Sequence, residues 1–123
     1  IVFNRLKFNR TELAKFSMIC AEAANKGCAA SRKIFNEAAS EIFAHLSVLA
    51  KKLDLKDNFI VSYTGGVFKA GDLILKPLKD LINKSNLKCK LQEPQLEPWD
   101  GSVLLAYKLA GNIIPDNVEE LFN

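Results

Sequence analysis

The six glycines of this sequence stand between apolar, periodic segments, and this spacing limits the fold more than any other feature. Glycine favours the ends of helices and strands because it adopts backbone conformations that other residues avoid. These junctions are Gly27, Gly65, Gly66, Gly71, Gly101 and Gly111. The segments between them predict helices over 10–26 and 29–53, a strand over 59–64, a helical stretch over 72–84, a strand over 88–91 and a helix capped by Asp100.

The two N-terminal helices each carry apolar residues at helical spacing. Asn9 followed by Glu12 resembles a capping box at the start of the first, and Gly27 is expected to end it. Its predicted core face is Leu13, Phe16, Ile19, Cys20 and Ala23. The predicted inner face of the longer second helix is Phe35, Ala38, Ala39, Ile42, Phe43, Leu46, Leu49 and Leu53.

The strands and the later helices complete an α/β pattern. Residues 59–64 are β-branched and aromatic, as in a buried parallel strand. Pro77 is expected to kink the following helix or restart it, because proline has no amide donor. The core face of the last helix is expected to hold Val103, Leu104 and Tyr107. The order α-α-β-α-β-α predicts a helix-rich α/β fold with few strands. Because two strands make a small sheet, either this portion is unusually helical or further strands of the sheet lie upstream.

Composition excludes several classes of protein. The 123 residues are 49% hydrophobic and 25% charged, which suits one globular domain rather than a disordered chain. No apolar run reaches the ~18–20 residues that cross a bilayer, so no membrane partner is expected. A net charge of +3 is too balanced to favour nucleic-acid binding. The sequence opens Ile1-Val2-Phe3 with no signal-peptide pattern, and we expect it to be a portion of a longer protein.

The three cysteines, Cys20, Cys28 and Cys89, have no C-x-x-C spacing. An odd number without that spacing argues against a disulfide framework and against a cysteine-rich zinc site. We therefore expect reduced thiols and a cytoplasmic location.

The clearest local signal for function is the sequence Thr64-Gly65-Gly66-Val67-Phe68 between a strand and a helix. Two glycines at the carboxyl end of a strand let a ligand come close to the backbone. Ligands of open α/β sheets bind outside the carboxyl ends of the strands. Taken alone, the pair is more often a tight strand-to-helix turn with no ligand.

Three segments in order resemble the C-terminal part of the BadF/BadG/BcrA/BcrD ATPase family and its N-acetylglucosamine kinase relatives, within the superfamily of actin, sugar kinases and heat-shock chaperones. The first segment is 22–38, similar to the family's A-x-x-G-D stretch and the helix after it. The second is 64–69, similar to its adenosine motif. The third is 98–106, similar to its G-A-x-x-x-A helix. The spacing and order of these segments agree with the family across about residues 10–111.

The resemblance implies an actin-like, ribonuclease H-like lobe over residues 1–111, followed by a tail over 112–123. It implies that Gly65, Gly66, Val67 and Phe68 hold adenine and ribose, with Gly27 near the same pocket. Gly101 and Ser102 would start the helix that leads back to the other lobe. The resemblance also implies ATP and Mg²⁺ as cofactors, and it is compatible with a homodimer.

Two departures from the family limit what this sequence can do. Cys28 stands where the family usually has an Asp that would cap the long helix. The phosphate loops D-x-G-x-T and D-x-G-G-T, which would supply the Mg²⁺ ligands, are not found here. Phosphoryl transfer needs a metal clamp and positioned phosphates. We therefore expect no catalytic residue and no metal ligand in this sequence, and no catalysis by it alone.

Other candidate residues have ordinary interpretations. His45 with Glu41 is expected to be an exposed pair on a helix, without metal partners. Lys84, Lys88 and Lys90 are expected to form a solvated rim. Cys20 and Cys28 do not lie in a short loop between strands, which argues against iron–sulfur ligation. Trp99 is expected to close a core.

The sequence therefore predicts the adenosine-side portion of an ATP-dependent kinase that phosphorylates a sugar hydroxyl, such as that of N-acetylglucosamine. Two alternatives stay open. The first is an ATPase activase that drives electron transfer to a dehydratase or reductase. The second is a helical interaction module that binds no nucleotide.

Overall fold

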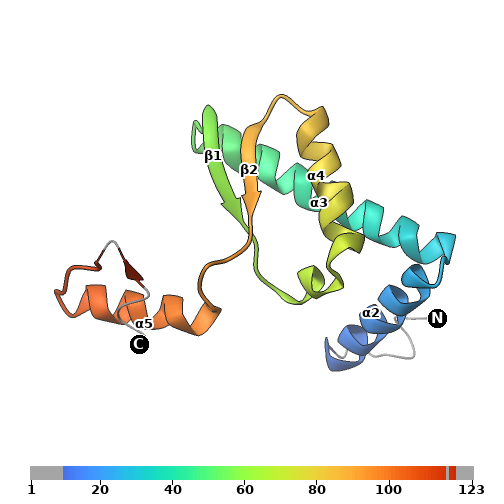
Figure 1. Ribbon diagram of the computed structural model, residues 1–123, viewed down its shortest axis with the longest axis horizontal. Helices are drawn as coiled ribbons and strands as arrows, with labels where there is room; N and C mark the ends of the chain where they lie inside the picture. Colours follow the sequence, from blue (N-terminus) through green and yellow to red (C-terminus); the bar gives the residue numbers. More distant parts are fainter. Residues whose placement is uncertain (1–9, 116, 119–123) are drawn as a thin grey trace. The chain divides into compact units, whose positions relative to one another are not determined.

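The computed structural model describes residues 10–115 and 117–118, with side chains from Phe16 onward. The chain forms two compact units divided between Gln92 and Glu93. Its fold is α/β and rich in helix, with a parallel two-stranded sheet among the described residues (Figure 1). The elements are α2 (Arg10–Asn25), α3 (Ala29–Lys52), β1 (Asp57–Ser62), η1 (Gly66–Ala70), α4 (Asp72–Lys84), β2 (Lys88–Gln92) and α5 (Pro98–Leu109). The predicted order is confirmed, with the short 3-10 helix η1 added between β1 and α4.

The corner between α2 and α3 is built as the sequence indicates. Gly27 ends α2 with φ +98°, and the amide of Cys28 donates to the carbonyl of Ala23 at 2.9 Å. The Arg32 Nε donates to the carbonyl of Ala24 at 2.9 Å. This side chain therefore ties the first turn of α3 to the last turn of α2.

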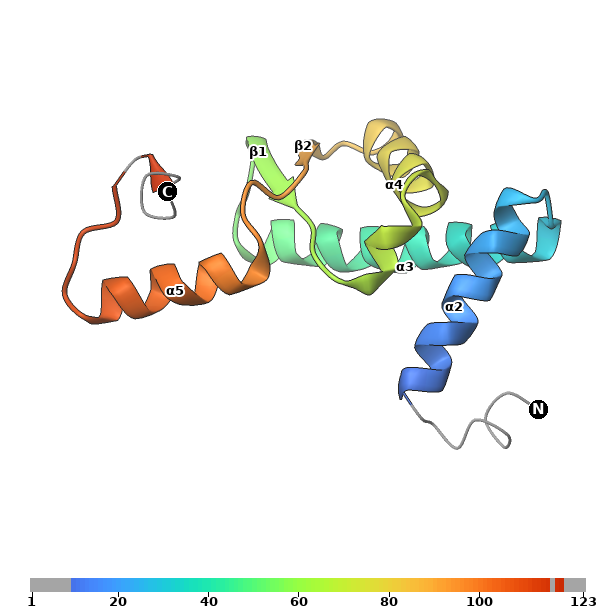
Figure 2. The ribbon, with the colours of Figure 1, turned by 60° about the horizontal axis from the view of Figure 1, so that its bottom comes forward.

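The strands β1 and β2 pair in parallel, and α4 is part of the connection between them. The sheet and α4 lie on the same side of α3 (Figure 2). The register shifts between Asp57 and Phe59, where Asn58 has φ +53°. At the same end of the sheet, Lys88 Nζ lies 2.9 Å from Asp57 Oδ1.

The core of the first unit lies where α2, α3 and α4 meet. Its buried residues are Cys20, Ala24, Phe35, Ala39, Ile74, Leu78 and Ile82. Ile74, Leu78 and Ile82 recur every four residues, so α4 presents one continuous apolar face to this core. Cys89 and Leu91 alternate toward it from β2, and Phe68 packs against it from η1.

The prediction that the helix restarts at Pro77 is wrong. The helix α4 runs without a break from Asp72 to Lys84, with Pro77 inside it. Pro77 removes one backbone hydrogen bond, but the buried face on either side of it holds the helix together. Tertiary packing here outweighs the local preference of proline.

Several predicted core positions are exposed. The first helix buries Cys20 and Ala24, whereas Phe16 and Ile19 are exposed to solvent. The side chain of Leu13 is not among those that the structure describes. At the C-terminal end of α3, Leu49 and Leu53 are exposed while Ala50 is buried. The strand β1 spans 57–62 rather than 59–64 and is not buried on both faces, since Ile60 is 63% exposed.

The second unit contains α5, whose start and packing both differ from the prediction. Glu97 rather than Asp100 is the N-cap residue, and the Asp100 carboxylate accepts a hydrogen bond of 2.9 Å from the Glu97 amide. Gly101 and Ser102 therefore lie inside the helix rather than at its start. The predicted core face is also wrong, since α5 has no buried residue. Trp99, expected to close a core, is 66% exposed.

After α5, residues 112–115 are irregular, and the rest of the predicted tail lies mostly outside the described residues. The proposed domain boundary after residue 111 stays a prediction. Across the described part of the chain, the helices are too short or too polar to span a bilayer.

Candidate functional site

The glycine turn, defined as Thr64–Val67, follows β1 beyond the carboxyl ends of the strands and includes the first two residues of η1 (Figure 1). All four of its residues are exposed. Gly65 has φ +114° and ψ 164°, a region that only glycine adopts without strain. A Cβ atom built on Gly65 or Gly66 would meet no heavy atom within 4 Å. The turn thus exposes bare backbone to open space, and a ligand can approach it closely.

The Phe68 ring lies immediately after the turn and packs against the Tyr63 ring immediately before it. Their centroids are 4.8 Å apart, and the rings are tilted by 37°. Both side chains are half-buried. The Phe68 amide also donates to the Gly65 carbonyl at 3.2 Å. The two ends of the exposed turn are therefore joined by a ring contact and a backbone hydrogen bond.

The predicted site residues do not all fall in one place. Gly65, Gly66, Val67 and Phe68 are consecutive and share the turn and η1. Gly27 lies elsewhere, at the corner between α2 and α3. The helix α2, which ends at this corner, contacts η1. The structure therefore gives the four consecutive residues a shared surface and leaves Gly27 outside it.

Cys28 occupies the N-cap position of α3, where the family pattern has Asp. Its backbone is extended, with φ −63° and ψ 112°. The Ser31 hydroxyl, and then the Ser31 backbone amide, favour the thiolate and lower the pKa of Cys28 below its usual value. Cys28 is exposed, so its thiolate is open to reagents.

We expect Cys28 to be alkylated by iodoacetamide faster than Cys89 near neutral pH. A lowered pKa keeps the Cys28 thiolate populated to lower pH, whereas burial raises the pKa of Cys89. The midpoint of the pH–rate curve, followed by peptide mass spectrometry, should thus be lower for Cys28. Ser31→Ala should move that midpoint upward, and Ser40→Ala, an exposed change on the same helix, should not. Equal midpoints for the two cysteines would contradict this assignment.

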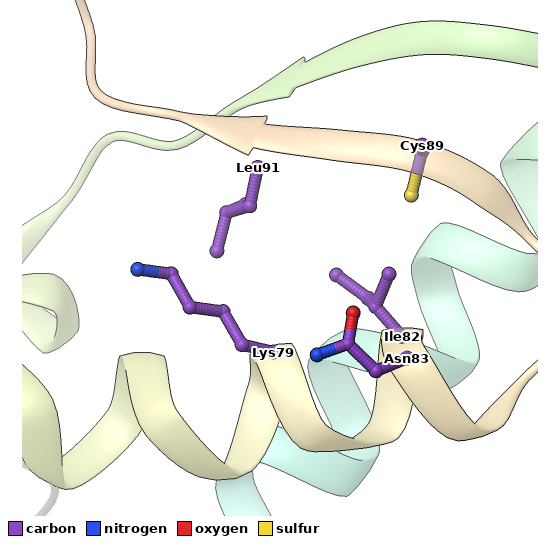
Figure 3. Close-up of a pocket in the computed structure, with 5 residues that line it drawn as sticks. All are labelled: Lys79, Ile82, Asn83, Cys89 and Leu91. Carbon is purple, nitrogen blue, oxygen red and sulfur yellow. The ribbon is translucent and has the colours of Figure 1, made fainter.

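A separate groove lies between α4 and β2, away from the glycine turn. Its volume is about 190 Å³, and it is lined by Lys79, Ile82, Asn83, Cys89 and Leu91. Cys89 and Leu91 point from β2 toward α4, while Lys79 and Asn83 rise from α4 beside Ile82 (Figure 3). The groove has an apolar floor with one cationic and one amide side chain at its rim, and it is large enough for a small apolar group.

The remaining candidates lie on the surface. His45 and Glu41 are both exposed, as are Lys84, Lys88 and Lys90. Lys88 is held by its ion pair with Asp57. Among the described residues, no group of three or more His, Cys, Asp or Glu side chains is placed to hold a metal ion.

Sequence reasoning did not single out Tyr63 or the residues at the rim of the groove. The alternation of Phe59, Val61 and Tyr63 along one face of the strand was the available signal for Tyr63. Lys79 and Asn83 are four residues apart and so share one side of α4, but nothing local indicates that β2 lies beside them.

The glycine turn combines exposed backbone with an exposed apolar side chain. Its backbone is bare, Val67 offers an exposed apolar side chain, and the Tyr63–Phe68 contact fixes its ends. Comparison with known proteins adds nothing to this geometry, since no family model, curated protein or solved structure matches the chain.

Proposed function

We propose that this chain is the adenosine-side portion of an ATP-dependent kinase or ATPase with an actin-like fold. The parent protein would resemble N-acetylglucosamine kinase and transfer a phosphoryl group from ATP to a sugar hydroxyl. The observation that carries the proposal is the conformation of Gly65, with φ +114° in an exposed turn beyond the carboxyl end of β1. A position that requires glycine and borders open space suits a close backbone contact with a ligand.

The arrangement around the turn supports adenosine as that ligand. The parallel strands β1 and β2 end at one edge of the sheet, and ligands of α/β folds bind beyond that edge. In the proposed site, the backbone of Gly65 and Gly66 lies against the adenosine, and Val67 supplies an apolar contact. A side chain at either glycine would occupy the space that the nucleoside needs.

The chemistry of the parent depends on groups beyond the described residues. Bound MgATP supplies the phosphoryl group, and the Mg²⁺ ligands are expected in the phosphate loops that this sequence lacks. The residues of this chain bind and orient the adenosine end. Closure of a second lobe would exclude water, so this portion alone is expected to bind nucleotide weakly and not to turn over.

A second candidate function is an interaction module that binds no nucleotide. The exposed apolar side chains of α5 favour it: Trp99, Val103, Leu105, Tyr107 and Leu109. A helix that is apolar on several sides is normally covered by another surface. In the kinase proposal the rest of the parent protein covers it, and in the alternative a partner protein does.

Calorimetric titration of ADP into the full-length gene product tests the proposal. We expect saturable binding of ADP, and no binding of inorganic pyrophosphate at the same concentrations if adenosine provides the main contact. ADP release that is stimulated by N-acetylglucosamine would support the sugar kinase. ADP release without sugar stimulation, together with bound iron, would support the activase instead. If the folded protein binds neither ADP nor ATP, the interaction module is the candidate function that remains.

A further inference from the structure

The two aromatic rings that border the glycine turn form one unit with the core. Phe68 packs against the buried cluster of α2, α3 and α4, and its carbonyl accepts a hydrogen bond of 2.9 Å from the Gly71 amide. Tyr63, at the end of β1, rests on the Phe68 ring with a centroid distance of 4.8 Å. The end of the strand is thus connected to the core through Phe68.

Between these two rings the chain lies on the surface. Thr64, Gly65, Gly66 and Val67 are all exposed, and no atom lies within 4 Å of a Cβ at either glycine. Two adjacent glycines give this segment large conformational freedom in the absence of restraints. Besides the structure of η1, which begins at Gly66, the ring contact and the hydrogen bond from the Phe68 amide to the Gly65 carbonyl restrain the path of the turn.

We infer that Tyr63 is a positioning residue for the nucleotide, acting through Phe68 on the backbone of Gly65 and Gly66. The inference rests on the proposed function. A turn whose ends are fixed is already close to its bound conformation, so binding does not have to order it. Loss of the Tyr63 ring removes that order and weakens binding, although Tyr63 need not touch the nucleotide.

The test compares three variants of the full-length gene product by calorimetry with ADP. Aromatic contacts of this kind are worth about 0.5–1.5 kcal/mol, which corresponds to roughly 2- to 12-fold in affinity. We therefore expect Tyr63→Leu to raise the Kd for ADP by about 3- to 10-fold. Tyr63→Phe retains the ring and should bind like the wild type. Phe43→Leu is the matched control, since Phe43 is also half-buried against the core but lies on α3.

A kinetic measurement separates positioning from a general loss of packing. If the sugar kinase assay succeeds, Tyr63→Leu should raise KM for ATP and leave kcat at saturating ATP unchanged. Circular dichroism confirms that each variant is folded, and Tyr63→Ile replaces Tyr63→Leu if the latter unfolds.

The outcomes distinguish this inference from the function on which it rests. If the wild type does not bind ADP, the proposed function and the positioning role of Tyr63 are both wrong. If the wild type binds and Tyr63→Leu binds equally well, the positioning role alone is wrong. Weakening by Phe43→Leu as large as that by Tyr63→Leu also overturns it, because the effect would then come from lost core packing.

Discussion

Gly65→Ala should weaken ADP binding by about tenfold or more and lower the free energy of unfolding by about 1–3 kcal/mol. The backbone of Gly65, with φ +114° and ψ 164°, lies in a region closed to residues that carry a Cβ. Alanine would force the turn into another path and move the surface proposed to meet adenosine. Calorimetry with ADP and urea unfolding followed by circular dichroism measure the two effects.

Gly66→Ala is the matched control because it adds the same methyl group one residue later. Gly66 has no positive φ, and its added Cβ would meet no atom within 4 Å. We expect it to change stability by no more than about 1 kcal/mol, in either direction. It should still weaken ADP binding, since the methyl group enters space proposed for the ligand. Full ADP affinity in both alanine variants would rule out adenosine at this turn.

Ile74→Ala should lower the free energy of unfolding by about 2–5 kcal/mol, the largest effect on stability expected of any single change discussed here. Ile74 is 0% exposed and lies where α4 packs on α3. Removal of its side chain leaves a cavity that two rigid helices cannot close. Since small domains are stable by only about 5–15 kcal/mol, the loss is a large share of the total. The measurement is the free energy from urea unfolding.

Leu109→Ala serves as the comparison for Ile74→Ala. Leu109 is 78% exposed on α5, so its truncation removes little buried surface and should change stability by no more than about 0.5 kcal/mol. A similar loss in both variants would mean that α5 is covered in solution. A small loss at Ile74 would contradict the placement of the core at the α3–α4 contact.

The ends of α2, α3 and α4 were predictable because local chemistry sets them, whereas the bounds of β1 and the start of α5 were not. Gly27 ends α2, and the stretch from Asp72 to Lys84 is helical as its spacing indicates. Burial was less predictable, since periodicity shows which residues share a face but not what covers that face. Ile60 and Val103 are apolar and correctly spaced, yet both are exposed among the described residues.

In the candidate site too, local features were predictable from the sequence and tertiary contacts were not. The glycine turn follows from the sequence, because a strand, two glycines and a helix specify a turn with exposed backbone. The contact of Tyr63 with Phe68 does not, because it depends on how far the chain turns back within four residues. The groove at Lys79 depends on the parallel register of β2, which no local signal gives.

The irregular start of β1 has a consequence for how the protein behaves at high concentration. An unpaired strand edge invites identical chains to add to it and so begins aggregation. Asn58, with φ +53° at the register shift, bends β1 away from the flat geometry that such stacking requires. An incoming strand therefore meets a regularly paired stretch of β1 only from Phe59 onward.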